Sequence, residues 1–160
     1  MVPNRVCDWL YTGVAMKVLA IDPGERVGWA TANVVADVPD AAPELHPQNR
    51  GVNPLKDFAM KLGEVIADYD VVIYETFRLR ANMNKAMIGN EFLPSQLIGM
   101  IRYLGWHNPS VKMVPLAPSM KQKTEKSFPR FMQEWIKNST EEHDKDAAQL
   151  LWAWFFKEYV

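Results

Sequence analysis

The sequence contains a single cysteine, Cys7, which excludes an internal disulfide and a metal site built from thiolates. It has no apolar run of the roughly 18 residues that span a bilayer, and no signal-peptide pattern opens the chain. Internal repeats and low-complexity tracts are missing too. We therefore expect a soluble protein of the reducing cytoplasm that does not bind membranes.

A strong net charge is also lacking, because 18 basic residues stand against 19 acidic ones. The charges are unevenly distributed. Residues 76–137 hold ten Lys or Arg against three acids, and the segments on either side are acidic. This pattern is compatible with a phosphate-binding face beside an acidic site, and equally with an ordinary solvated surface.

The length of 160 residues fits one domain, and the 48% hydrophobic content with six tryptophans indicates a globular fold. Residues 1–15 have no clear periodicity and are interpreted as an extension of uncertain order. Residues 16–160 are expected to form the domain.

Short apolar runs bounded by turn residues predict the strands. Two of these runs end in an acid, and residues 36–50 are expected to be a loop with room for an edge strand. The predicted strands are 17–22, then 27–32 as its hairpin partner after a Pro23-Gly24 turn, 71–75 and 111–115.

Residues with the 3.6-residue period predict four helices. Asn53-Pro54 is expected to start the first, Gly105 to end the second, and Ser139 with Glu142 to form a capping box for the last. Strands and helices in alternation predict an α/β fold, a mixed sheet of about five strands with helices on both faces. The predicted helices run from 55 to about 69, from 93 to 104, around 128–136, and from about 140 to 159.

Acidic residues stand at three places that such a fold brings together. Asp22 and Glu75 end two buried strands, whose carboxyl ends meet at one edge of a sheet if the strands are neighbours. His143 and Asp146 share one face of the last helix. Each acid has an ordinary structural explanation as a turn, strand-end or helix-dipole residue. Their combination in this order favours a site, and the role of Asp144 between them is left open.

Oxygen ligands without thiolates favour Mg²⁺ or Mn²⁺. Two such ions per site can activate a water and stabilise the leaving oxygen of a phosphodiester. Without a cation, clustered carboxylates raise one another's pKa. We therefore expect two Mg²⁺ or Mn²⁺ ions and no small-molecule cofactor.

Three motifs resemble those of the RuvC-type Holliday-junction resolvases of the RNase H-like superfamily. They are Ile21-Asp22-Pro23-Gly24 followed by Gly28-Trp29-Ala30, then Ile73-Tyr74-Glu75-Thr76-Phe77, and then His143-Asp144-Lys145-Asp146-Ala147-Ala148. The resemblance covers about residues 16–157. It implies an RNase H-like fold and a two-metal endonuclease acting on branched DNA.

By that match Asp22, Glu75 and Asp146 are metal ligands, and His143 is the fourth member of the catalytic set. The last motif is more similar to that of resolvases encoded by bacteriophages. The middle segment and the N-terminal extension depart from the cellular family, which leaves junction specificity open. A nuclease for RNA–DNA hybrids or flaps, or a module that binds branched DNA without cutting it, remains an alternative.

Basic residues near these motifs are candidates for DNA binding. Arg78, Arg80 and Lys85 follow Glu75 and are expected to contact phosphates. Phe77 would stack on bases or pack within its loop. Lys121 and Lys123 belong to a second cluster, where the family has a DNA-contacting lysine, although a solvated surface explains these residues as well.

The resemblance also implies a homodimer with two-fold symmetry, because a resolvase cuts two strands symmetrically. The helix with Leu93, Leu97, Ile101 and Leu104 is a candidate dimer element. The apolar surface of the last helix is a second candidate, unless it forms the core.

Overall fold

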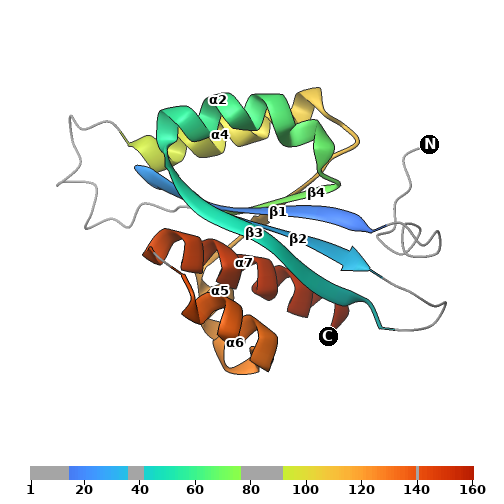
Figure 1. The fold of residues 1–160 in the computed structure, drawn as a ribbon. Coiled ribbons are helices and arrows are strands. Elements are labelled where there is room, and N and C mark those ends of the chain that lie inside the picture. The colour runs from blue at the N-terminus through green and yellow to red at the C-terminus, as the bar shows by residue number, and fades with distance from the viewer. Residues whose placement is uncertain (1–14, 36–41, 77–91, 140) are drawn as a thin grey trace.

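The computed structural model describes residues 15–35, 42–76, 92–139 and 141–160, so residues 1–14 of the expected extension lie outside them. Its centre is a five-stranded mixed sheet in the order β3-β2-β1-β4-β5 (Figure 1). The strands are β1 (Met16–Asp22), β2 (Arg26–Val35), β3 (Glu44–Pro54), β4 (Val71–Glu75) and β5 (Lys112–Leu116).

The pairing of the strands follows from their connections. β1 and β2 form the predicted antiparallel hairpin, whereas β4 and β5 run parallel to β1 after helical crossovers. The four strands predicted from apolar runs are thus confirmed. The parallel pairing of β1 with β4 brings their carboxyl ends to the same edge of the sheet.

The edge strand for which the sequence left room within residues 36–50 is present as β3, which begins at Glu44 and continues beyond the expected loop to Pro54. Its polar side chains are typical of an edge strand with one solvated face. Asn53 is not the cap of the next helix: its side chain accepts a hydrogen bond from Nε1 of Trp29 at 2.7 Å. The helix begins at Leu55, and its N-cap residue Pro54 makes no side-chain cap hydrogen bond.

Helices cover both faces of the sheet, as predicted (Figure 1). On one face lie α2 (Leu55–Val65), which continues into the short η1 (Ile66–Asp68), and α4 (Leu93–His107). On the other face lies α7 (Glu142–Tyr159), accompanied by α5 (Pro118–Thr124), η2 (Glu125–Ser127) and α6 (Arg130–Lys137).

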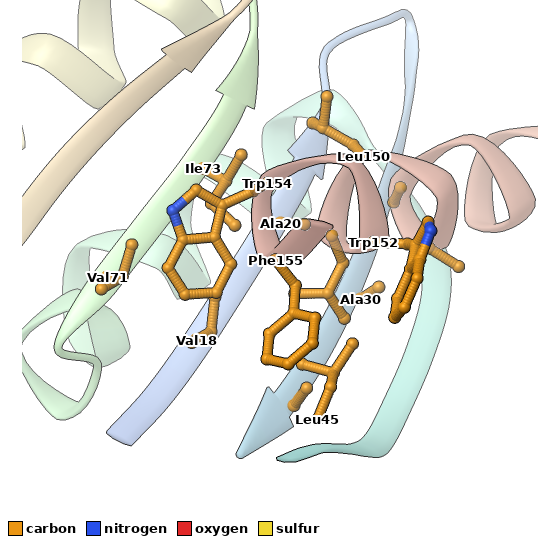
Figure 2. Close-up of a cluster of buried hydrophobic side chains, with 14 of the residues drawn as sticks. Val18, Ala20, Ala30, Leu45, Val71, Ile73, Leu150, Trp152, Trp154 and Phe155 are labelled. Atoms are coloured by element: carbon orange, nitrogen blue, oxygen red, sulfur yellow. The ribbon is translucent and has the colours of Figure 1, made fainter. Parts of the chain in front are cut away.

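The core between α7 and the sheet shows whether the apolar surface of the last helix is buried within the domain or free to bind a second copy. Trp154 is fully buried and lies over Val18, Val71 and Ile73 of the sheet, as Figure 2 shows. Trp152 and Phe155 are also buried. The apolar surface of α7 therefore forms the core of the domain.

Two helix boundaries differ from the predictions, and one helix was not expected. α4 continues past Gly105, where a Cβ atom would lie 2.6 Å from Cγ of Met113, so this glycine permits close packing of α4 on β5. The predicted capping box is wrong, because the N-cap residue of α7 is Glu141 and it makes no side-chain cap hydrogen bond. α5, which begins at Pro118, was not predicted at all.

The helix α4, which the sequence suggested as a dimer element, packs mostly into the core of its own chain. Leu97 and Ile101 of α4 are 1% and 0% exposed, so these side chains cannot reach a second copy. None of the helices in the described part of the chain combines the length and the apolar composition that a membrane span requires.

Candidate active site

The carboxylates of Asp22 and Glu75 lie at one edge of the sheet, as their positions in the sequence predict. Ile21 pairs with Tyr74 in the parallel register of β1 and β4, so the next residue on each strand emerges at the same end. The Asp22 side chain is 10% exposed and that of Glu75 is 19% exposed. Two negative groups are therefore held in a poorly solvated place.

The first turns of α7 add His143 and Asp146 to this edge. Nδ1 of His143 is hydrogen-bonded to Oδ2 of Asp22 at 3.0 Å. The helix reaches this point because Gly28 stands opposite Asp22 in the β1–β2 register. A Cβ atom at Gly28 would lie 1.9 Å from the backbone oxygen of His143, so only glycine leaves room for the helix there.

Lys121 of α5 places its ammonium group among the three carboxylates. Its Nζ atom lies 2.6 Å from Oε2 of Glu75, 3.6 Å from Oδ2 of Asp146 and 3.8 Å from Oδ1 of Asp22. The Lys121 side chain is 14% exposed. The sequence suggested Lys121 only as a DNA contact, because nothing local to it indicates that three distant acids surround it.

The charges and the burial of this cluster shift two pKa values. Burial raises the pKa of Asp22, and the negative charges of Asp146 and Glu75 add to this effect, while His143 and Lys121 oppose it. Burial disfavours the ammonium form of Lys121. The hydrogen bond to Glu75 and the charges of the three acids outweigh it, and the pKa of Lys121 is raised. Lys121 is therefore a firmly charged counterion of the cluster.

The chemistry of these side chains fits a hard divalent cation, since carboxylate oxygens are the ligands that Mg²⁺ and Mn²⁺ prefer. Their arrangement is set for an ammonium group instead. Within the described part of the chain, no three His, Cys, Asp or Glu side chains stand close enough to hold one metal ion. A cation in this space has to compete with Lys121.

The site opens into a pocket of about 280 Å³. Its walls come from β4, α5, η2 and α7, and they carry both charged and amide side chains. The lining residues are Glu75, Pro118, Lys121, Gln122, Glu125, Asp146 and Gln149. A larger pocket of about 600 Å³ between α6 and α7 shares Glu125 and Gln149 with it but contains none of the clustered acids.

The predicted DNA-binding residues are only partly described. Phe77, Arg78, Arg80 and Lys85 lie outside the described residues. Lys123 is exposed on α5, and at two residues from Lys121 it points to another side of the helix. Arg50 was not among the predicted site residues, yet it pairs with Asp144 at 3.2 Å. Nothing in the sequence around this single arginine, in a segment expected to be a loop, indicated a contact with the last helix.

No protein-family model matches the chain, and no curated protein matches its sequence. Similar solved structures include the crystal structure of the fowlpox virus Holliday junction resolvase. It has a TM-score of 0.57 and 15% sequence identity, and the match covers 89% of this chain and 99% of that one.

Two further structures have the same architecture. The complex of fowlpox virus resolvase with its substrate Holliday junction DNA has a TM-score of 0.55 at 16% identity, covering 89% of this chain and 98% of that chain. The yeast mitochondrial Holliday junction resolvase has a TM-score of 0.52 at 15% identity, covering 88% and 78%. At these identities the likeness concerns the fold, so the predicted RNase H-like α/β fold is confirmed.

Proposed function

We propose, from the fold that this chain shares with Holliday junction resolvases, that it is a metal-dependent, structure-selective endodeoxyribonuclease that hydrolyses phosphodiesters in branched DNA. The observation that carries this proposal is the convergence of Asp22, Glu75 and Asp146 around one point at the sheet edge. Three acids gathered from two strands and a helix are costly to assemble without a function, because like charges disfavour one another.

Asp22, Glu75 and Asp146, with His143 as the fourth member, would hold Mg²⁺ or Mn²⁺, two ions per site. When bound, the ions supply the positive charge that activates a water and stabilises the leaving oxygen. His143 fixes the orientation of the Asp22 carboxylate through their hydrogen bond. The buried setting strengthens each electrostatic contact with the reacting phosphate, since the local dielectric is low.

Lys121 is proposed to act at the phosphate. Its ammonium group borders the pocket beside Glu75 and Asp146, and with cations held by these carboxylates it would be free to face the pocket. There it would pair with a phosphate oxygen next to the scissile bond. Arg78, Arg80, Lys85 and Lys123 would contact phosphates farther along the DNA, and Phe77 would stack on bases at the branch point.

Paired cleavage of a junction requires two active sites related by two-fold symmetry, so we propose a homodimer. The exposed side of α4 is its proposed interface, because Tyr103 and Trp106 are 54% and 78% exposed there. Aromatic side chains are enriched at protein interfaces.

The test is cleavage of end-labelled four-way junction, flap, linear duplex and RNA–DNA hybrid in Mg²⁺ and in Mn²⁺. Wild-type protein is compared with Asp146→Asn and with Asp57→Asn, a matched control at an exposed acid of α2. The expected result is paired nicking of the junction that Asp146→Asn abolishes and Asp57→Asn retains.

Other outcomes separate the alternatives. If the protein cuts flaps or hybrids in preference to junctions, the proposed active site stands and the proposed substrate is wrong. Tight junction binding without cleavage in either metal would make the protein a binding module and overturn the proposed activity.

A further inference from the structure

The first turn of α7 is attached to three adjacent strands. β1 holds it through the hydrogen bond between Asp22 and His143. β2 holds it through the close approach of Gly28 to the His143 backbone. β3 holds it through an ion pair between Arg50 and Asp144. The first two contacts involve the candidate catalytic set directly, whereas the third lies outside it.

The Arg50–Asp144 pair is buried and has a defined direction. Nε of Arg50 donates to Oδ2 of Asp144 at 3.2 Å, and the two side chains are 13% and 4% exposed. Nη1 of Arg50 donates to the backbone oxygen of Trp135 in α6. The guanidinium group also lies 5.1 Å from the centre of the Trp135 ring. One side chain of β3 thus ties together α7 and α6.

Stability alone is a poor explanation for this pair. Removing two charges from water costs much of what their attraction returns, and a well-packed apolar pair is often as stable. The second oxygen of Asp144, Oδ1, is buried and has no hydrogen-bond partner among the described residues, so the carboxylate is only half satisfied. What a forked guanidinium provides is a fixed direction for the group that it binds.

Asp144 lies between two members of the candidate site but does not share their face. Successive residues of a helix are separated by about 100°, so His143 and Asp146 point to one side and Asp144 to another. Its contact with Arg50 therefore sets the rotation of the helix, and with it the direction of both neighbours.

We propose that Arg50 and Asp144 are positioning residues that hold the first turn of α7 in the rotation that directs His143 and Asp146 at Asp22 and Glu75. Neither residue touches substrate. The proposal deepens the proposed nuclease function and rests on it for its consequence in catalysis. Its structural part, the local ordering of this helix start, is measurable without cleavage.

The experiment compares Arg50→Met, Asp144→Asn and the double variant Arg50→Met/Asp144→Leu with wild type. Arg26→Gln is the matched control, since Arg26 pairs with Glu141 at the same helix start but is 52% exposed. Asp144→Asn keeps the size of the side chain and serves if Arg50→Met does not fold. The readouts are amide hydrogen exchange along α7, the midpoint of urea unfolding, junction affinity, and kcat in saturating Mg²⁺.

We expect the amides of residues 145–148, the first that can bond within α7, to exchange at least about tenfold faster in both single variants, with little change at residues 150–156. Their kcat should fall about 10- to 100-fold while junction affinity changes little, because misplaced groups lose the reaction geometry before they lose binding. The double variant should regain the unfolding midpoint without regaining kcat. Arg26→Gln should match wild type.

A purely structural pair predicts something else. Exchange would then accelerate evenly along α7, and activity would follow the folded fraction and return together with stability in the double variant; either result overturns the proposal. If wild type cuts none of the substrates, the nuclease function fails, and the exchange profile alone decides whether the pair orders the helix start.

Discussion

The ammonium group of Lys121 lies 2.6 Å from a carboxylate oxygen of Glu75, although 46 positions separate the two residues in the sequence. The contact joins α5 to the end of β4, and Asp22 and Asp146 lie within 4 Å of the same nitrogen. A single lysine thus offsets part of the charge of three acids. Its position has consequences for both stability and metal binding.

Replacing Lys121 with methionine should destabilise the protein in the absence of divalent metal, because three acids then repel one another without a counterion. We expect the free energy of unfolding to fall by about 1–3 kcal/mol, the cost of leaving buried groups without their partner. Mn²⁺ should bind Lys121→Met more tightly than wild type, since the competing ammonium group is gone. Urea unfolding and calorimetric titration measure the two effects.

The control is Lys123→Met, two residues farther on an exposed side of α5. It should change neither stability nor Mn²⁺ affinity. Weaker Mn²⁺ binding by Lys121→Met would contradict the competition between lysine and metal.

Asp22 should make stability depend on pH in the metal-free protein. Its pKa is raised by burial above the ordinary value of 3.8, so the folded protein holds this proton more tightly than the unfolded chain. The contribution of Asp22 to stability is therefore greatest below pH 3.8 and is lost as the pH rises through the folded pKa.

An Asp22→Asn variant removes this titration. In the presence of a metal chelator, Asp22→Asn should be more stable than wild type at pH 7. This difference in stability should disappear as the pH falls below about 3.8. Thermal unfolding across a pH series measures this difference. A variant that is less stable than wild type at neutral pH would show that the hydrogen bond to His143 outweighs the burial of the charge.

Gly28→Ala should disturb the seating of α7 on β2. Its new Cβ atom would lie 1.9 Å from the backbone oxygen of His143, and backbone atoms cannot move aside without shifting the helix. We expect a loss of about 1–3 kcal/mol in the free energy of unfolding, as for other overpacked sites. Denaturant unfolding checks this value.

Gly63→Ala is the control, because the position that a Cβ atom would occupy is open at Gly63 and blocked at Gly28. Among the described residues, no atom beyond its chain neighbours and the backbone of its own helix lies within 4 Å of a Cβ at this position in α2. Alanine should therefore stabilise the helix by about 0.5–1 kcal/mol. If both glycine variants changed stability in the same direction, the close approach at Gly28 would not be the reason for its effect.

Trp106→Glu should weaken the proposed homodimer. Trp106 is 78% exposed on α4, and a charge there would oppose burial against a second copy. Sedimentation equilibrium over a range of concentrations should give a dimer for wild type and a monomer for the variant. Met60→Glu, on the neighbouring helix α2, shows whether the interface extends beyond α4. A wild-type protein that is monomeric at all concentrations would contradict the dimer.

The full length of the polar edge strand β3 and the presence of the helix α5 were not predicted, for physical reasons. β3 is held by its pairing with β2 rather than by an apolar pattern of its own. α5 spans only seven residues, too few for a hydrophobic period to emerge. The expected cap at Asn53 failed because its side chain accepts a hydrogen bond from Trp29 instead. The hydroxyl of Ser139 is buried and has no hydrogen-bond partner among the described residues, and the residue before α7 is Glu141, so Ser139 lies too early in the chain to cap this helix.

Local sequence patterns are enough to predict the strands that end at Asp22 and Glu75, the helix that begins near His143, and hence the edge at which the acids meet. These features depend on local apolar periodicity and on the geometry of parallel strands, which short stretches of sequence encode. The folded chain, by contrast, was needed to find that Lys121 faces the acids and that Arg50, 94 positions from Asp144, binds it. Partners so far apart are selected by the packing of the whole chain, because any exposed cation is locally equivalent until the fold buries one of them.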